Sequence, residues 1–285
     1  MFEFNTYTMV GQVFFSFFLP IFQLLFINYI YVTHSKIKKF HFLLLFIFFL
    51  NIFSAVNQKA FNMTAINSIR PLIDAARQAS FSLRKIDDLI IKKVLHKMAD
   101  ALETNRDIIL KLNTEDLKNG KAMHLSPEAI ERLYMDNDRL LGLTACARAF
   151  ASNYKQLVLK NDDGLDIPKA SLYAVVYESR PYISAEASIQ AFAAGHAIVL
   201  RGGKEGFHTN TVIVSILGDV LENNGLPRAL ITLIPTTDRV AMTELISLKD
   251  HIDYVIPRGS DGLITYIKKN SKVTVATQLP NVYYK

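Results

Sequence analysis

The chain has 285 residues, enough for one large domain or two ordinary ones, and a net charge of +6. It contains a single Cys, which excludes an internal disulfide framework and a CxxC motif. It contains no Trp. Basic residues are interleaved with acids, as in Arg84 to Asp88, so a solvated surface of mixed charge is favoured over a nucleic-acid-binding face. The histidines never occur at paired ligand spacing, so no metal is expected.

The first 62 residues differ in composition from the rest, because they hold 15 of the 19 Phe and a single acidic residue. The apolar run Val10–Val32 is long enough to span a bilayer and Phe40–Val56 is marginal, since about 20 apolar residues are needed. The loop between them is rich in lysine, which by the positive-inside rule would send the remaining chain outside the cytoplasm. A signal peptide explains two such runs poorly. Two interpretations of the leader remain: a pair of membrane segments, or a spurious extension upstream of a start at Met63.

Residues 68–154 show a helical pattern, in which apolar residues recur at spacings of three and four with charges between them. We expect Asn113–Asp116 and His124–Glu128 to divide this region into separate helices. Ser126 is a good N-cap because proline follows it at the first helical position.

From residue 171 to the end, short apolar runs alternate with amphipathic helices. The predicted buried strands are Leu172–Tyr177, Ala197–Leu200, Ala229–Ile234 and Tyr254–Ile256. The predicted helices between them are Ala185–Ala194, Thr211–Glu222 and Arg239–Leu248, and Gly225 suits the cap of the second. This alternation predicts an α/β fold with a parallel sheet, whose ligands collect at the carboxyl ends of the strands.

Three predicted strands end in residues that favour phosphate binding. The segments are Glu178-Ser179-Arg180-Pro181, Arg201-Gly202-Gly203-Lys204-Glu205 with a helix start at His208-Thr209-Asn210, and Pro257-Arg258-Gly259-Ser260. Glycines let a backbone approach a phosphate closely, and a helix start presents free N–H groups to it. Arg201 and Lys204 would add positive charge. No Gly-x-Gly-x-x-Gly or P-loop sequence is present, so it is the convergence of these segments at one sheet edge that favours nucleotide binding.

These segments resemble γ-glutamyl phosphate reductase (glutamate-5-semialdehyde dehydrogenase) of the aldehyde dehydrogenase superfamily, and the reductase half of bifunctional pyrroline-5-carboxylate synthases. Order and spacing match over roughly Met63 to Val275. The stretches that carry the resemblance are Ala75–Ser80, Val176–Pro181, Leu200–Glu205, His208–Asn210, Thr237–Arg239 and Asp253–Ser260. Leu-Arg-Gly-Gly-Lys-Glu and Ile-Pro-Arg-Gly-Ser are its most specific elements.

The resemblance implies a Rossmann-like sheet of the aldehyde dehydrogenase type and NADPH-dependent reduction of γ-glutamyl phosphate to glutamate 5-semialdehyde, the second step of proline synthesis. It places Arg201, Lys204 and Glu205 around the adenosine ribose and its phosphate, and Gly259 and Ser260 at the pyrophosphate. The rest of the expected NADP site is Gly202, Gly203, Pro257 and Arg258. The family is usually homo-oligomeric.

The same resemblance bears on localisation and domain organisation. A user of NADPH belongs in the cytoplasm, so we expect a cytoplasmic protein in which residues 1–62 are a spurious extension. Anchoring in a membrane through residues 10–56 is the alternative. The predicted cofactor-binding domain is 63–285, helical over 68–154 and α/β over 171–285.

The sequence departs from the family pattern at several positions. The family's nucleophilic cysteine lies downstream of where this chain stops, and Cys146 sits among small residues with no neighbouring base, so we expect a small core residue there. Tyr182 stands where the family usually has Asn, whose amide would stabilise an oxyanion. The stretch Tyr154–Ser171 is shorter than in the family, and Val273–Leu279 replaces a glycine-rich segment.

Three hypotheses about function follow from these observations. The chain is a family reductase, a nucleotide-binding module without turnover, or a decayed remnant of the enzyme. We favour a reductase by descent that has no independent activity as this chain, and we predict no catalytic residue within it.

Overall fold

A computed structural model describes residues 68–153 and 170–277 of the chain. The chain divides into two units, residues 1–66 and 67–285, and all described residues belong to the second. The apolar runs Val10–Val32 and Phe40–Val56 lie outside the described residues. Among the described helices, none is long and apolar enough to cross a membrane.

The part before the sheet is helical, as predicted. Its elements are α3 (Arg70–Ser80), the 3-10 helix η1 (Phe81–Lys85), α4 (Asp88–Thr104), α5 (Arg106–Ala122), α6 (Pro127–Leu133) and α7 (Asn137–Ser152). Side chains that precede the helices define several of their starts: Asp87 accepts a hydrogen bond from the backbone N–H of Leu89, and Asp136 accepts one from Arg139. Ser126 caps α6 in the same way, which confirms the predicted N-cap.

The remaining chain forms a parallel sheet with helices between its strands. The strands are β1 (Leu172–Tyr177), β2 (Ala197–Arg201), β3 (Ile231–Leu233), β4 (Tyr254–Arg258) and β5 (Thr274–Val275), in the order β3-β2-β1-β4-β5. The helices are α9 (Tyr182–Ala193), α10 (Phe207–Asn223), α11 (Arg239–Leu245) and α12 (Asp261–Asn270), with short 3-10 turns η2 (Lys204–Gly206) and η3 (Arg228–Leu230). All strand pairings are parallel, which confirms the predicted α/β fold.

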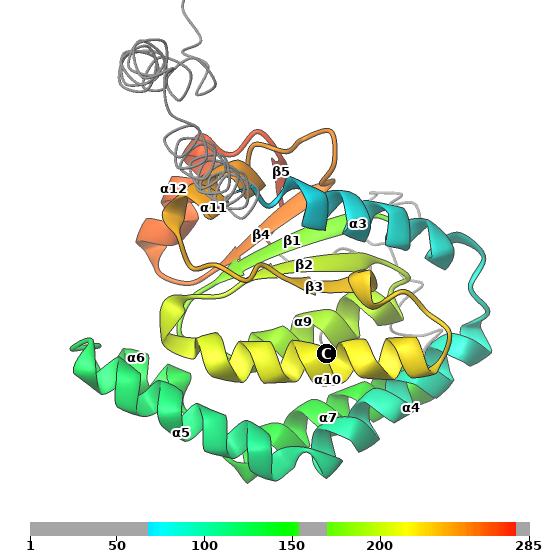
Figure 1. Ribbon diagram of the computed structural model, residues 1–285, viewed down its shortest axis with the longest axis horizontal. Coiled ribbons are helices and arrows are strands. Elements are labelled where there is room, and N and C mark those ends of the chain that lie inside the picture. Colours follow the sequence, from blue (N-terminus) through cyan, green and yellow to red (C-terminus); the bar gives the residue numbers. More distant parts are fainter. Residues whose placement is uncertain (1–67, 154–169, 278–285) are drawn as a thin grey trace, which may run out of the picture. The chain divides into compact units, whose positions relative to one another are not determined.

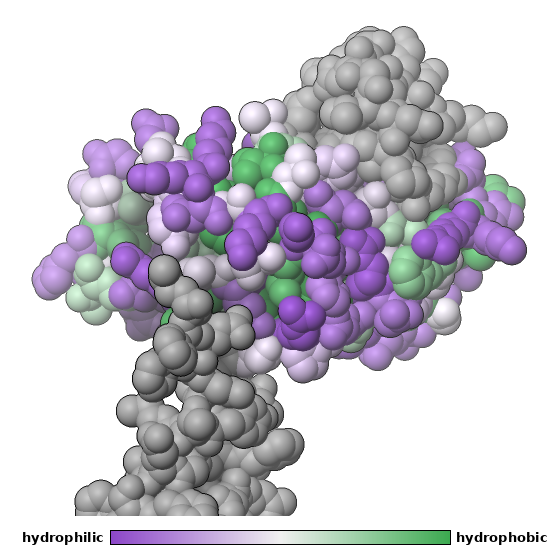
Figure 2. Space-filling model, turned by 90° about the horizontal axis from the view of Figure 1, so that it is seen from above, coloured by the Kyte–Doolittle hydropathy of each residue, from purple (hydrophilic) through white to green (hydrophobic). Residues whose placement is uncertain are grey.

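Helices cover both faces of the sheet (Figure 1). α9 and α10 pack on one face and α3 on the other, while α4, α5 and α7 form a further layer outside α9 and α10. The buried core is one continuous cluster that joins the helical region to the sheet. On the face shown in Figure 2, the described surface is mostly hydrophilic with small hydrophobic areas.

Several element bounds differ from the prediction. α9 begins at Tyr182 rather than Ala185. It is buried on nearly all sides, with Glu186 the one residue between Ile183 and Ala193 that is not fully buried, so it lacks the apolar stripe that marks a helix start. β3 is shorter than Ala229–Ile234 because η3 takes its first residues.

The predicted helix break at Asn113–Asp116 is wrong. α5 runs through these residues without interruption. The helical structure is interrupted instead at Asn105, which lies between α4 and α5. The side chains of Asn113 and Asp116 are each 1% exposed, and both form hydrogen bonds with residues outside α5. Asn113 donates from Nδ2 to the carbonyl of Leu133 and accepts at Oδ1 from the N–H of Met135. Polar residues that usually signal a turn are here used for tertiary contacts.

Asp116 holds the start of α10. Its carboxylate accepts hydrogen bonds from the backbone N–H groups of His208 (3.2 Å) and Thr209 (2.8 Å), and from the Oγ1 of Thr209 (2.7 Å). Burial raises the pKa of this carboxyl above its ordinary value, although the hydrogen bonds from Thr209 and His208 act in the opposite direction. A side chain of α5 therefore caps the first turn of α10, where His208 lies 92 residues later in the chain.

We expect Asp116→Ala to lower the free energy of unfolding by about 2–3 kcal/mol, because it leaves the buried N–H and hydroxyl of Thr209 without an acceptor. Urea denaturation of the full-length chain, followed by circular dichroism, measures the effect. The control is Asp107→Ala on the same helix, where an exposed side chain should contribute less than about 1 kcal/mol. Equal urea midpoints for the two variants would show that the cap does not stabilise the fold.

Candidate functional site

The three strand ends that carry the unusual residues lie side by side. β2, β1 and β4 are neighbours, and the paired residues Val176–Arg201 and Tyr177–Arg258 bring their carboxyl ends to one edge. The backbone N–H of Glu178 donates to the carbonyl of Arg258 at 3.1 Å. The order of the strands reverses between β1 and β4, and open parallel sheets bind ligands at such a reversal. The structure thus brings these segments together as expected.

Glu205 turns back into the protein at this edge. It is 8% exposed, and its Oε1 accepts hydrogen bonds from the backbone N–H and the Oγ of Ser179. Ser179 has a φ of 47°, in the left-handed region that non-glycine residues adopt at a cost. A Cβ at Gly203 would lie 2.1 Å from Oε1 of Glu205. A side chain at position 203 would therefore have to displace the Glu205 carboxylate from its place beside Ser179.

Gly202 is restricted in a similar way, by Asn210 of α10. A Cβ at Gly202 would lie 2.2 Å from Nδ2 of Asn210. Asn210 accepts a hydrogen bond from Ser184 Oγ at 2.9 Å, and Ser184 is bonded to the hydroxyl of Tyr177 at 2.6 Å. Burial raises the pKa of the Tyr177 phenol, so this hydroxyl keeps its proton. The buried chain of hydrogen bonds joins β1, α9 and α10 beneath the strand ends.

Glu178 spans the gap between β1 and α12. Its Oε2 accepts hydrogen bonds from the backbone N–H (3.2 Å) and the Oγ (3.0 Å) of Ser260, and a Cβ at Gly259 would lie 2.8 Å from the same oxygen. Ser260 is also the N-cap of α12, because its Oγ accepts from the N–H of Leu263. The backbone that was expected to meet a pyrophosphate is thus in contact with a carboxylate.

The expected cations at this edge differ in exposure. Arg201 is 8% exposed, and its Nη2 donates to the carbonyl of Thr237 at 2.6 Å. Lys204 is exposed. Pro257 is buried inside β4, opposite Val176, whereas Arg258 ends that strand and faces a cavity. The start of α10 is occupied by Asp116, so its first N–H groups are not free for a phosphate.

A cavity of about 280 Å³ lies between the sheet and α9. Three charged residues line it, Arg180, Glu186 and Arg258, together with the apolar Val175 and Ile256; the other lining residues are Tyr182, Ile183, Ala187 and Gln190. Burial raises the pKa of the Glu186 carboxyl, against the charge of Arg258 and a hydrogen bond with Gln190. The cavity can accept a small ligand that carries both anionic and cationic groups.

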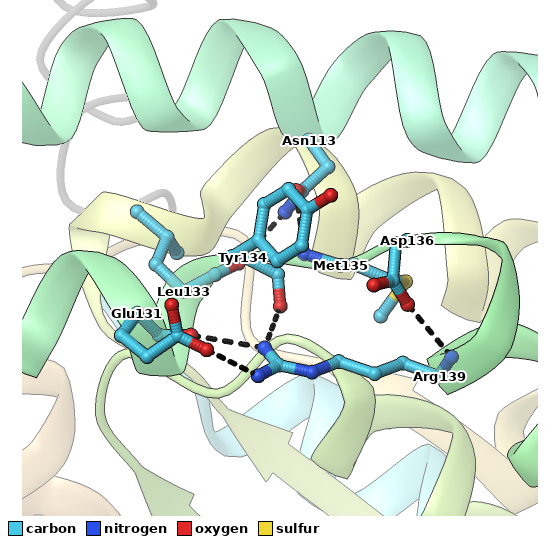
Figure 3. A network of polar contacts seen from close by, with 7 residues as sticks. All are labelled: Asn113, Glu131, Leu133, Tyr134, Met135, Asp136 and Arg139. Carbon is cyan, nitrogen blue, oxygen red and sulfur yellow. Dashed lines mark hydrogen bonds and ion pairs between the residues drawn. The ribbon is translucent and has the colours of Figure 1, made fainter.

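A second cavity, of about 390 Å³, shares Tyr182 and Glu186 with the first as lining residues. Figure 3 shows the network behind one of its walls, the connection from α6 to α7. Arg139 donates to the backbone carbonyls of Glu131 and Tyr134 and to the Glu131 carboxylate at 2.6 Å, while Asn113 holds the next residue, Met135. This network fixes the wall that carries Glu131 and Arg139; the other lining residues are Arg132, Gly142, Leu143 and Cys146.

No family model matches the chain. Curated proteins do match it. The γ-glutamyl phosphate reductase of Salinibacter ruber is 33% identical over 232 residues, which cover 74% of this chain and 53% of that protein. The enzyme of the same name from Nautilia profundicola is 34% identical over 216 residues, or 73% and 53% of the two chains.

Solved structures agree with these matches. The γ-glutamyl phosphate reductase of Thermotoga maritima superposes with a TM-score of 0.67 at 26% identity, over 73% of this chain and 52% of that one. This chain is a relative of the γ-glutamyl phosphate reductases. It spans about half the length of the relatives that it matches. A protein from Listeria monocytogenes described as a probable aldehyde dehydrogenase, with a TM-score of 0.57 at 15% identity, shows the same fold.

Cys146 lies on α7 at the second cavity, as a half-buried residue. Burial raises the pKa of its thiol, and the charge of Glu186 raises it further, so the thiolate is disfavoured. No base neighbours Cys146 in the sequence, but the fold brings the Glu186 carboxylate close enough to affect the thiol. That influence lowers the reactivity of the sulfur, in keeping with the expected small core residue.

The roles of Asp116 and Glu186, and the backbone strain of Ser179, were not predicted from the sequence. Asp116 was interpreted as part of a helix break, and nothing local to it indicates a partner in α10. Glu186 carried a usable signal, because it is a lone acid in a helix that is otherwise apolar, small or neutral. The strained backbone of Ser179 has no signal in the sequence, since its neighbours could form an ordinary turn.

Gly203→Ala should lower the free energy of unfolding by about 1–3 kcal/mol, because the added Cβ displaces Glu205 and leaves the buried N–H of Ser179 without an acceptor. Gly142→Ala is the matched control: nothing lies within 4 Å of its Cβ and it is inside α7, so it should stabilise by about 0.5–1 kcal/mol. Chemical denaturation compares them. A neutral Gly203→Ala would show that Glu205 is not held as described.

Alkylation of Cys146 should be slow at mildly alkaline pH. Its raised pKa means less thiolate at a given pH, so the rate should reach half-maximum at a higher pH than in the urea-unfolded chain. Because the chain has a single Cys, iodoacetamide labelling followed by mass spectrometry reports on this thiol alone. Glu186→Gln should lower the pH at which the labelling rate is half-maximal, because it removes a negative charge near the thiol. A folded chain that labels as fast as the unfolded one would contradict the assignment.

Proposed function

We propose that the described region binds NADP along the carboxyl edge of its sheet, as the cofactor-binding part of a γ-glutamyl phosphate reductase. The observation that supports it best is the meeting of the ends of β2, β1 and β4 at the reversal of strand order, together with the reductase relatives. When bound, NADPH supplies the hydride that reduces an acyl group. The proposal places the protein in the cytoplasm and in proline synthesis.

The residues of the edge differ in what they can offer NADP. Lys204 is the exposed cation of the Arg201–Glu205 segment and is free to meet the 2′-phosphate. Arg201 already donates to the carbonyl of Thr237, and this bond supports the loop that follows β3. We therefore assign direct phosphate contact to Lys204 and a supporting role to Arg201. The N–H of Ser260 is the backbone donor for the pyrophosphate.

The cavity beside α9 fits the second substrate. A γ-glutamyl group carries an ammonium and a carboxylate, and its phosphate adds further negative charge. Arg180 and Arg258 can hold the anionic groups and Glu186 the ammonium. Tyr182 lines the same cavity and can donate a hydrogen bond from its phenol. These side chains would bind and orient the substrate.

Within this chain no side chain is suited to the covalent step. The nucleophile of acyl transfer through a thioester is a thiolate, and Cys146, the one Cys in the sequence, has a raised pKa. We infer that the chain binds cofactor and has no reductase activity on its own. The covalent step would need a reactive thiolate that these 285 residues do not supply.

Fluorescence titration of the full-length chain with NADPH tests the proposal. We expect saturable binding at micromolar concentration. Lys204→Ala should weaken NADPH about fivefold and NADH much less, because only NADPH carries the 2′-phosphate and an exposed charge pair contributes about 1 kcal/mol. Its melting temperature should be that of the wild type.

Arg201→Ala is the companion variant. Because Arg201 is buried and bonded to Thr237, it should lower the melting temperature and weaken both nucleotides alike. Absence of NADPH binding by the folded wild-type chain would reject the proposed function. Equal weakening of NADPH and NADH by Lys204→Ala would remove the 2′-phosphate role from that residue.

A further inference from the structure

Carboxylates of the chain itself occupy the groups at the sheet edge that suit a phosphate. Asp116 takes the first N–H groups of α10, Glu205 takes the N–H of Ser179, and Glu178 takes the N–H and Oγ of Ser260. These contacts differ in burial. Asp116 and Glu205 are 1% and 8% exposed. Of the residues that donate to them, Thr209 and Ser179 are buried, at 0% and 8%, whereas His208 is exposed.

Glu178 is the carboxylate that can leave its place. It is half-buried, and its partner Ser260 is exposed, so its side chain has a path to solvent. The bonds to Ser260, at 3.2 Å and 3.0 Å, are also longer than those that hold Asp116 to Thr209, at 2.8 Å and 2.7 Å. Displacing it exposes the N–H of Ser260 without opening the core.

The position of Glu178 is where a ligand of this sheet is expected. It bridges β1 and the start of α12, which follows β4, and the strand order reverses between those two strands. The carboxylate contacts Gly259 so closely that a Cβ there would be 2.8 Å away. A phosphate that approached the backbone of Gly259 and Ser260 would meet this negative charge at contact distance.

The structure also offers a place for the displaced charge. Arg201, on the neighbouring strand, lies within electrostatic reach of Glu205 and Glu178: burial lowers its pKa, and both carboxylates act against that effect. Its Nε is buried and has no hydrogen-bond partner among the described residues. A carboxylate that leaves Ser260 therefore stays near a buried cation whose charge favours it.

We propose that Glu178 is a displaceable occupant of the pyrophosphate position, and that a dinucleotide binds only by moving this carboxylate away from the N–H of Ser260. The inference rests on the proposed binding of NADP. Glu178 then determines affinity: the chain binds ligands with a pyrophosphate more weakly than the same backbone would without the negative charge. Ligands that lack a phosphate at this position do not compete with Glu178.

The test compares full-length wild type, Glu178→Gln and Asp261→Asn in titrations with NADPH and with adenosine 2′-phosphate, which has no pyrophosphate. Glu178→Gln removes the charge but keeps an oxygen that can accept from Ser260. It should bind NADPH about fivefold tighter, because the repulsion between two negative charges at contact distance in solvent amounts to roughly 1 kcal/mol. Its affinity for adenosine 2′-phosphate should not change. The gain should shrink in high salt.

Asp261→Asn is the matched control, because it removes one exposed negative charge from the first turn of the same helix. It should change NADPH affinity less than twofold. Equal or weaker NADPH binding by Glu178→Gln, or equal tightening of both ligands, overturns the inference while the proposed function stands. No NADPH binding by any folded variant rejects both. If Glu178→Gln does not fold, Glu178→Ala is measured against the same expectations.

Discussion

The contact between Asp116 and the start of α10 joins the helical region, α3 to α7, to the region that forms the sheet. It brings a carboxylate from the helical layer to the first N–H groups of a helix that follows the second strand of the sheet. Burial of the charge raises its free energy, and three donors offset that effect. Because α10 is placed by this contact and by packing against α4 and α5, the loop that begins at Arg201 has a defined position.

The same kind of interaction recurs along the sheet edge with a different consequence. Acidic side chains accept hydrogen bonds from backbone and side-chain donors that the glycine-rich segments expose, and the glycines leave room for those carboxylates. Features that suit a phosphate also suit a carboxylate, since both are anions that accept from N–H groups. The hydrogen-bond donors of the site are therefore bonded to carboxylates of the chain itself. The affinity for a nucleotide depends on which of these hydrogen bonds can be broken.

Much of the fold follows from local pattern. β1 matches its predicted bounds because a buried parallel strand is a short, continuous apolar run, and Ser126 caps α6 because the cap and the following proline act within one turn. The predicted start of α9, Ala185, lies after the observed start at Tyr182, because the helix is buried on nearly all sides and has no polar face. Asn113 was interpreted as a helix break because its preference for turns is local, whereas its partners Leu133 and Met135 lie in another segment.

The sequence by itself determined the alternation of helix and strand, the residues at each strand end and the kinship with γ-glutamyl phosphate reductases. Periodicity and short motifs carry that information, since each is set by neighbours in the chain. Only the tertiary structure decided where the charges point. Asp116 meets Thr209 across 93 residues and Glu178 meets Ser260 across 82. The direction of a carboxylate depends on which donors the fold brings near it, and no local pattern encodes them.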